Sequence, residues 1–225
     1  MTSQARSIVI AVDGPSGSGK SSTSRGTAAK LGLRYLDTGA MFRAMTWWML
    51  EHGVDVHDAD AVTAAAGRPE IVSGTDPLAP TIVVDGTDVA VAIRGDAVTG
   101  AVSPVSAVPA VRSRLLELQR AVIGEGGIVV EGRDIGSVVW PQAEVKVYLT
   151  ADPAARAARR ALEEGGSDVA ATQESLLARD KIDSGRATAP LTMPEGAHHI
   201  DTTDFTLDEV IGQLVALSEA VGAAR

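Results

Sequence analysis

The feature that most constrains this chain is a glycine-rich segment placed directly after a short β-branched run. Residues 7–12 predict a buried strand, and residues 14–21 read Gly-Pro-Ser-Gly-Ser-Gly-Lys-Ser. This segment fits the pattern G-x-x-x-x-G-K-[ST] at every fixed position, and small and apolar residues with helical spacing follow over 20–31. A strand, a glycine-rich loop and a helix in this order predict an α/β fold with a nucleotide-binding site.

The residue types of the loop match the chemistry of a polyphosphate. Glycines let backbone N–H groups surround phosphate oxygens, and the N-terminus of the following helix adds positive potential. Lys20 is expected to bridge the β- and γ-phosphates, and the Ser21 hydroxyl to bind Mg²⁺. The candidate nucleotide-binding residues are Gly14, Pro15, Ser16, Gly17, Ser18, Gly19, Lys20, Ser21 and Ser22.

The rest of the chain alternates strand-like and helix-like segments. We expect further strands over 34–36, 128–130 and 145–149 and a last strand before residue 201, and helices over 40–52, 109–124, 152–161 and 206–221. Such alternation predicts a parallel five-stranded sheet flanked by helices.

One stretch interrupts this alternation. Short extended runs at 70–72, 81–84 and 88–93 are separated by Gly74-Thr75-Asp76-Pro77 and by Asp85-Gly86, which are typical of hairpin turns. We therefore expect a small antiparallel β lobe inserted at about 67–96 into a single domain of 225 residues, whose core is formed by 1–66 and 97–225.

Composition excludes several classes of protein. The chain has no cysteine, so it contains no disulfide, thiolate zinc site or cysteine nucleophile. With 20 basic and 29 acidic residues its net charge is −9, and only 3% of residues are aromatic, so it is a poor nucleic-acid binder. Apolar runs fall short of the roughly 18 residues of a membrane span. We expect a soluble, cytoplasmic protein that binds neither nucleic acid nor membrane.

Two further observations indicate which class of nucleotide-binding protein this chain belongs to. The chain has no asparagine and therefore no Asn-Lys-x-Asp motif, which argues against a GTPase. Sixteen of the 20 basic residues are arginines, whose forked guanidinium groups match phosphate oxygens. A small protein with a phosphate-binding loop and many arginines suits a kinase for an anionic small molecule.

The arginines occupy informative positions. Arg43 lies about one turn into the helix after Asp37-Thr38-Gly39, and Glu131-Gly132-Arg133-Asp134 follows a predicted strand, at the edge where α/β sheets bind ligands. Three more share one face of a helix, and two flank an aspartate at helical spacing; these residues are Arg156, Arg159, Arg160, Arg179, Asp183 and Arg186. Each of these arginines except Arg133 could instead be a solvated charge, and the three at 156, 159 and 160 could pair with Glu163 and Glu164.

Four blocks of the sequence, 13–20, 36–43, 131–139 and 179–191, resemble the bacterial cytidylate kinases, a family of P-loop nucleoside monophosphate kinases. The resemblance extends from about residue 8 to residue 205. It implies ATP-dependent phosphorylation of CMP and dCMP to CDP and dCDP with Mg²⁺, by in-line transfer. It also implies that the antiparallel lobe lies in the monophosphate-binding region and that residues 152–187 form a helical lid over ATP.

The resemblance also implies roles for individual residues. Ser103, Arg112 and Asp134 would read the cytosine. Arg43, Arg133 and Arg186 would bind the acceptor phosphate, while Arg179 and Asp183 would meet the sugar. Residues 201–203 would lie near the adenine. The full candidate sets are, for CMP, Thr38, Arg43, Ser103, Arg112, Arg133, Asp134, Arg179, Asp183 and Arg186; for ATP, the loop residues with Arg156 and Arg160; for catalysis, Lys20, Arg133 and Arg186; and for the metal, Ser21.

Some positions depart from the family pattern, and some alternatives stay open. Thr38 and Phe42 stand where serine and tyrosine are frequent, Glu131 replaces an aspartate of some relatives, and Gly185 replaces a bulkier polar residue. A kinase for UMP, AMP or shikimate and a non-catalytic nucleotide-binding module remain alternatives. Because an acceptor phosphate is already ionised, we assign no general base. We expect a monomer.

Overall fold

The computed structural model describes residues 7–163, 165–186 and 188–223 of the chain. The strands are β1 (Val9–Asp13), β2 (Arg34–Asp37), β3 (Ile71–Ser73), β4 (Ile82–Val84), β5 (Thr87–Asp88), β6 (Ile128–Gly132), β7 (Val145–Thr150) and β8 (His198–Asp201). The α-helices are α1 (Lys20–Leu31), α2 (Thr38–Glu51), α3 (Ala59–Ala65), α4 (Asp96–Ala107), α5 (Pro109–Ile123), α6 (Pro153–Glu163), α7 (Val169–Gly185) and α8 (Leu207–Ala223). A 3₁₀ helix spans Ala92–Arg94, and a π-helix spans Ile135–Val139.

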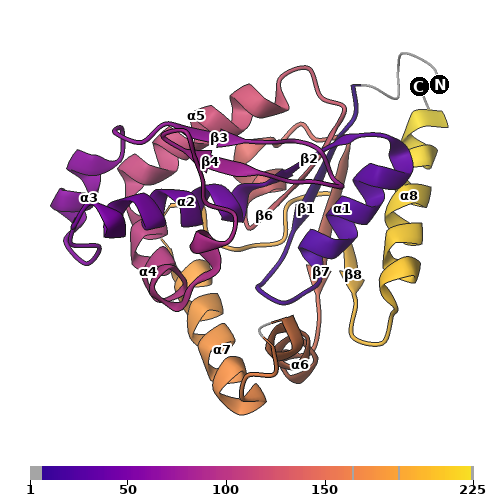
Figure 1. The fold of residues 1–225 in the computed structure, drawn as a ribbon. Coiled ribbons are helices and arrows are strands. Elements are labelled where there is room, and N and C mark those ends of the chain that lie inside the picture. The colour runs from indigo at the N-terminus through magenta and orange to yellow at the C-terminus, as the bar shows by residue number, and fades with distance from the viewer. Residues whose placement is uncertain (1–6, 164, 187, 224–225) are drawn as a thin grey trace.

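The larger sheet has the strand order β2-β6-β1-β7-β8, and all its strand pairs are parallel. This confirms the predicted five-stranded parallel sheet. Figure 1 shows α1 and α8 on one side of the sheet and α2 and α5 on the other. Both faces of the strands are therefore covered, which explains why the strands read as nearly continuous apolar runs.

Alternate residues of β1 enter two different cores. Val9 belongs to the cluster that includes Met45 of α2 and Leu115 of α5, whereas Ile10 belongs to the cluster that includes Leu214 of α8. Because side chains alternate across a strand, β1 holds the two helical layers together from the middle of the sheet.

The carboxyl ends of three neighbouring strands meet at one edge of this sheet. Asp13 of β1 is paired in register with Gly132 of β6, and Asp37 of β2 is paired with Glu131. Parallel strands place such ends together, and ligands of α/β proteins bind there. The loop 14–19 and the motif that begins at Glu131 therefore lie side by side.

The predicted inserted lobe contains a separate antiparallel sheet in the order β3-β4-β5. The expected third strand over 88–93 is wrong beyond Asp88. The Asp88 Oδ1 accepts a hydrogen bond of 2.9 Å from the Ala90 N–H, and the Ile93 N–H donates to the Val89 carbonyl at 3.0 Å. These local bonds turn the chain into a 3₁₀ helix instead of extending the strand.

Sequence patterning did not predict α3, α4 or the π-helix. In α4, Gly100 and Pro104 are poor helix formers, so local propensity argues against a helix. Its buried residues Val98, Val102 and Val105 show that an apolar face compensates. The helix expected over 206–221 is confirmed as α8, and a capping box precedes it, since the Thr206 N–H donates to Glu209 Oε2 at 2.8 Å.

Helices α6 and α7 pack against one another below the sheet in the view of Figure 1. The Asp168 side chain caps α7 by accepting from the Ala170 and Ala171 N–H groups. Across the described part of the chain, no helix is long and apolar enough to cross a membrane.

Candidate active site

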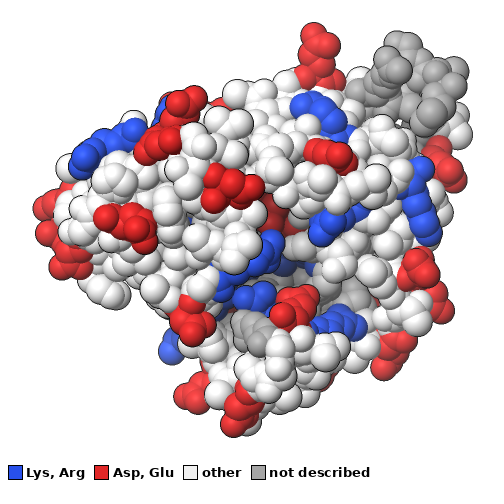
Figure 2. Space-filling model, in the orientation of Figure 1, with Lys and Arg blue, Asp and Glu red and all other residues white. Residues whose placement is uncertain are grey.

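A cleft of about 1170 Å³, including its open mouth, lies at the carboxyl edge of the large sheet. Figure 2 shows basic side chains gathered in a hollow near the centre of the visible face. The cleft is lined by all nine candidate CMP-binding residues, and by Ser16, Gly17, Gly19, Lys20, Ser21, Ser22 and Arg160 of the candidate ATP set. Gly14, Pro15, Ser18 and Arg156 of that set do not line it. The structure thus brings residues from four separate sequence blocks to one space.

The glycine-rich loop adopts a backbone that other residues could not follow. Gly14 has φ of 147°, and a Cβ atom there would lie 2.1 Å from the Leu149 carbonyl oxygen. Gly17 has φ of 76°, and its Cβ would lie 3.0 Å from the Arg156 carbonyl oxygen. Positive φ and close backbone approach both require glycine. The two glycines therefore fix the loop against β7 and α6.

Lys20 is buried inside this loop. Its Nζ donates a hydrogen bond of 2.6 Å to the Pro15 carbonyl, and only 6% of the residue is exposed. Burial and, to a smaller extent, the positive charge of Arg133 lower the Lys20 pKa to about 7. A buried ammonium group is costly unless an anion compensates it. A polyphosphate bound at the loop would supply such an anion.

A carboxylate connects the loop with the neighbouring strands. Ser21 Oγ donates to Glu131 Oε2 at 3.0 Å, and Tyr35 donates to Glu131 Oε1. Burial and, to a smaller extent, the nearby Asp37 carboxylate raise the Glu131 pKa to about 7. Asp37 also lines the cleft, and it caps α2 by accepting from the Ala40 N–H at 2.9 Å. Glu131 and Asp37 belong to predicted motifs, but the sequence assigned them no role.

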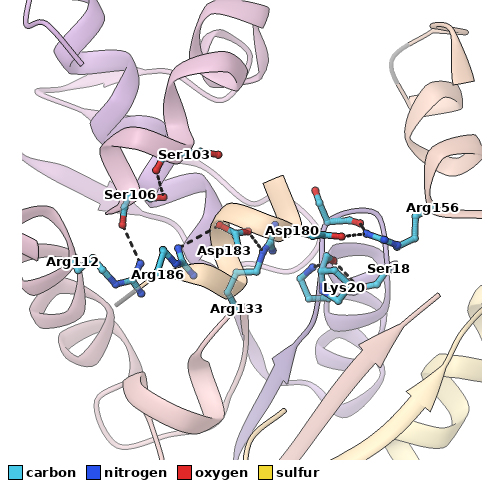
Figure 3. Close-up of polar contacts among 12 residues, drawn as sticks. Ser18, Lys20, Ser103, Ser106, Arg112, Arg133, Arg156, Asp180, Asp183 and Arg186 are labelled. Carbon is cyan, nitrogen blue, oxygen red and sulfur yellow. Dashed lines mark hydrogen bonds and ion pairs between the residues drawn. The ribbon is translucent and has the colours of Figure 1, made fainter. Parts of the chain in front are cut away.

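The acceptor side of the cleft holds an interlinked set of arginines and aspartates (Figure 3). Arg133 Nε donates to Asp183 Oδ2 at 2.9 Å, and Arg186 Nη1 lies 3.5 Å from Asp183 Oδ1. Arg186 Nε and Nη2 and Arg179 Nε are buried without a hydrogen-bond partner among the described residues. Burial lowers the pKa of both Arg179 and Arg186. Such unsatisfied cationic donors are the groups that an acceptor phosphate or sugar would satisfy.

At the other end of the cleft, Arg112 forms a buried ion pair with Asp134, and its Nη1 donates to the Ser106 carbonyl at 3.2 Å. The Arg112 guanidinium also lies over the Phe42 ring, 5.3 Å from its centroid. Burial raises the Asp134 pKa, while the Arg112 charge opposes this. Ser103 lines the cleft next to this pair, and Ser106 and Phe42 line it too although the sequence assigned them no role.

Two more of the predicted CMP-binding residues, Thr38 and Arg43, are held by protein groups. Thr38 Oγ1 donates to the Glu131 carbonyl at 2.7 Å, so its hydroxyl supports the motif backbone. Arg43 Nη1 donates to Thr99 Oγ1 at 3.0 Å and to the Ile93 carbonyl at 3.3 Å. Burial and, to a smaller extent, the Arg179 charge lower the Arg43 pKa to about 10. Both residues still line the cleft.

The three arginines of α6 contact different partners. Arg156 Nη1 lies 2.5 Å from Asp180 Oδ2 and 3.1 Å from the Ser16 carbonyl oxygen, so it joins α7 to the glycine-rich loop. Arg159 Nη2 donates to the Thr202 carbonyl at 2.6 Å, beside the predicted adenine loop. Arg160 lines the cleft and pairs with Glu163 at 3.3 Å. The alternative partner Glu164 lies outside the described residues.

Together these observations define the class of the protein. A phosphate-binding loop after the central strand of a parallel sheet, and a cleft lined by arginines at the carboxyl edge, are the features of a P-loop kinase. The family model for cytidylate kinase matches residues 10–220. The chain therefore belongs to the cytidylate kinase family, a family of transferases that act as nucleoside monophosphate kinases.

Individual relatives agree with this family assignment. A cytidylate kinase of Streptomyces avermitilis is 59% identical over 220 residues, covering 97% of this chain and 95% of its own length. A cytidylate kinase of Rhodococcus opacus is 51% identical over 226 residues, covering 97% of this chain and 98% of its own. One from Mycobacterium avium is 48% identical over 212 residues, with 92% and 93% covered. The resemblance predicted from four sequence blocks is confirmed.

A solved structure shares the fold. The crystal structure of an uncharacterized protein from Eubacterium ventriosum has a TM-score of 0.53 and 11% sequence identity, covering 95% of this chain and 99% of that chain. Because the two sequences are only 11% identical, the similarity of the two structures shows a shared fold and nothing about function.

Proposed function

We propose that this protein transfers the γ-phosphoryl group of ATP to CMP and dCMP, giving CDP and dCDP. The single observation that carries the proposal is the shared cleft: Lys20 of the glycine-rich loop and the buried guanidinium group of Arg186 open onto one space. Donor and acceptor phosphates bound there face one another, as in-line transfer requires.

The pair Arg112 and Asp134, with Ser103 beside it, supports recognition of cytosine. Cytosine presents an exocyclic amine, which donates, next to ring acceptors. A carboxylate accepts from the amine, while a guanidinium and a hydroxyl donate to the acceptors. Uracil carries a carbonyl in place of the amine, which a carboxylate repels. We therefore assign base selection to these three residues.

The remaining arginines suit the monophosphate and the sugar. Arg43, Arg133 and Arg186 bind the acceptor phosphate in this proposal, and Arg179 and Asp183 bind the sugar. The unpartnered nitrogens of Arg179 and Arg186 support these roles, because a substrate oxygen satisfies them. Thr38 contributes by holding the Glu131 backbone.

On the donor side, residues 14–22 surround the ATP phosphates, with Arg156 supporting the loop and Arg160 facing the cleft. The oxygens of Ser21 and Glu131 fit Mg²⁺, which prefers oxygen ligands. The described residues contain no cluster of three or more metal-binding side chains, in keeping with an ion held mainly by substrate phosphates and water. When bound, Mg²⁺ supplies neutralisation of the phosphate charge.

Catalysis in this proposal is positioning plus electrostatics. Lys20, Arg133 and Arg186 spread the charge that develops on the transferred group, and no general base is needed because the acceptor oxygen is already ionised. Residues 152–187 act as a lid that excludes water, and the lobe at about 67–96 covers the monophosphate side. We further propose a cytoplasmic monomer that acts on free nucleotides rather than on nucleic acid or a membrane.

The proposal is tested by measuring ADP release from ATP and Mg²⁺ with CMP, dCMP, UMP, AMP, GMP and shikimate. Strong turnover with CMP and dCMP is expected. Turnover with another acceptor alone would leave the kinase assignment and remove the base-reading roles. ATP binding without transfer to any acceptor would favour a non-catalytic nucleotide-binding module.

A further inference from the structure

One buried carboxylate at the edge of the cleft has no part in the chemistry proposed above. Asp13 is the last residue of β1, directly before the glycine-rich loop, and it is fully buried. Its Oδ1 accepts from the Ile135 N–H at 2.7 Å and its Oδ2 from the Gly136 N–H at 2.8 Å. Each oxygen thus binds one of two successive backbone donors, directly after Arg133 and Asp134.

The far end of the same segment is held by a second side chain. Arg120 of α5 donates from Nε to the Val139 carbonyl and from Nη2 to the Val138 carbonyl, each at 3.0 Å. The residues between the two attachments form the π-helix, in which the Trp140 N–H reaches back to the Ile135 carbonyl at 2.7 Å. Single π-helical turns are rare and are frequently found at functional sites.

The close approach of Asp13 favours glycine at position 136. A Cβ atom at Gly136 would lie 3.3 Å from Asp13 Oδ2 and 3.0 Å from Cγ of Pro194. The strand register places Asp13 beside Gly132, so the carboxylate reaches across one strand to the chain that follows β6. One side chain therefore joins the start of the donor loop to the start of the acceptor segment.

Burying the charged carboxylate of Asp13 is by itself energetically unfavourable. Burial outweighs the opposing effect of the two N–H donors, so the Asp13 pKa is raised to about 6. A buried charge lowers the stability of the folded protein unless it is well paired. The neutral amide of an asparagine would offer one acceptor oxygen, whereas residues 135 and 136 present two N–H donors. The two-oxygen geometry fixes both N–H groups at once, and so fixes the backbone that precedes them.

We propose that Asp13 and Arg120 are positioning residues for the acceptor side of the reaction. By holding the π-helix at both ends, they set how Arg133 and Asp134 enter the cleft. Neither touches substrate. This inference rests on the proposed roles of Arg133 and Asp134 in CMP binding, so its test must separate the two.

The experiment uses the full chain and three variants, Asp13→Asn, Arg120→Met and Glu144→Gln. Glu144 is a matched control, because its Oε2 accepts from the Val9 N–H at 2.9 Å, at the opposite end of the same strand. Dissociation constants for CMP alone and for ATP alone are measured by calorimetry, with kcat and KM for both substrates.

Asp13→Asn loses one buried hydrogen bond, and Arg120→Met loses two hydrogen bonds nearer the surface. We expect each variant to weaken CMP binding about tenfold and ATP binding less than about twofold. Glu144→Gln should change neither. Arg120→Lys, which keeps one donor, should recover part of the CMP affinity. A merely structural role would weaken both ligands together.

The proposal is overturned if CMP affinity is unchanged, or if both ligands weaken equally. If Asp13→Asn does not fold, Arg120→Met is tested in its place, and the criterion is again a loss of CMP affinity without an equal loss of ATP affinity. A fifth variant, Arg133→Ala, separates the inference from the proposed function. If Arg133→Ala loses CMP affinity while Asp13→Asn and Arg120→Met keep theirs, the positioning role is wrong and the proposed acceptor site stands. If it keeps CMP affinity, the proposed acceptor site itself is wrong.

Discussion

Ser21 of the glycine-rich loop donates a hydrogen bond of 3.0 Å from Oγ to Oε2 of Glu131, near the end of β6. The other oxygen of the same carboxylate accepts from Tyr35 on β2. Both carboxylate oxygens are therefore oriented by hydroxyl groups from neighbouring elements. The relationship links the proposed metal ligand Ser21 to the backbone of the acceptor motif, because Glu131 directly precedes Gly132 and Arg133.

The first prediction concerns this carboxylate. Glu131→Gln keeps the side-chain size but removes the negative charge beside Lys20 and Ser21. We expect kcat to fall about 100-fold, as for the loss of one preorganised electrostatic contact in an active site. The KM for CMP should change little, because Glu131 lies on the donor side. Steady-state kinetics at saturating ATP measure both quantities.

Tyr35→Phe is the matched comparison for that variant. It removes only the hydroxyl that supports Glu131 Oε1 and leaves the charge in place. The expected loss of stability is about 1 kcal/mol, the usual net value of one hydrogen bond, with a smaller loss of kcat than in Glu131→Gln. Equal kinetic losses in the two variants would contradict the importance assigned to the charge.

The second prediction concerns Lys20. Lys20→Met keeps most of the side-chain volume but removes the ammonium, and we expect kcat to fall about 100-fold or more because the transferring phosphoryl group loses a cation. The fold should persist, and the ligand-free protein should not be less stable, because burial already disfavours the charged form. Kinetics together with thermal unfolding test both parts.

The lowered pKa of Lys20 also predicts a pH dependence of stability. The pKa is about 7 in the folded protein and 10.5 ordinarily, so between these values the unfolded chain binds more protons than the folded one. Stability from this group should therefore rise with pH between about 7 and 10.5. The difference between wild type and Lys20→Met, measured by urea unfolding at several pH values, should follow this direction. A difference that is constant with pH would contradict it.

The third prediction tests the acceptor site. Arg133→Ala should raise the KM for CMP and lower kcat, each by about tenfold or more, because positioning and transition-state charge are both lost. Arg114→Ala is a suitable control, since Arg114 is not among the residues that line the cleft and, within the described part of the chain, it pairs with Glu117 at 3.9 Å on α5. An unchanged KM for CMP in Arg133→Ala would remove this residue from the acceptor site.

Local sequence patterns predicted the glycine-rich loop and the parallel sheet, because residues close together in the sequence determine both. The motif over 14–21 defines the strand, loop and helix around it, and alternating apolar segments define the parallel sheet. Helix α4 was missed because Gly100 and Pro104 oppose it and only packing stabilises it. Ser103, which lies on α4, was therefore found through family resemblance and not through any periodicity.

Long-range contacts were beyond prediction for a different reason. Asp13 and Ile135 are 122 residues apart in sequence, and no spacing rule connects them. The same holds for Ser21 and Glu131, which are 110 residues apart. Both carboxylates lie in segments that the sequence identified, but their partners are set by the strand order β2-β6-β1, which places the three carboxyl ends together.

The last prediction concerns base selection. Asp134→Asn replaces the carboxylate proposed to accept from the cytosine amine with an amide that can also donate to the uracil carbonyl. We expect kcat/KM for CMP to fall about tenfold or more and that for UMP to fall less, so the preference for cytosine narrows. Because Arg112 then loses its buried partner, the variant should also be less stable, by up to about 3–5 kcal/mol. Ser103→Ala changes another proposed base-reading residue but keeps the Arg112–Asp134 pair, so it shows the effect on base selection without the loss of stability. If Asp134→Asn left the ratio of CMP to UMP activity unchanged in folded protein, Asp134 would not be reading the base.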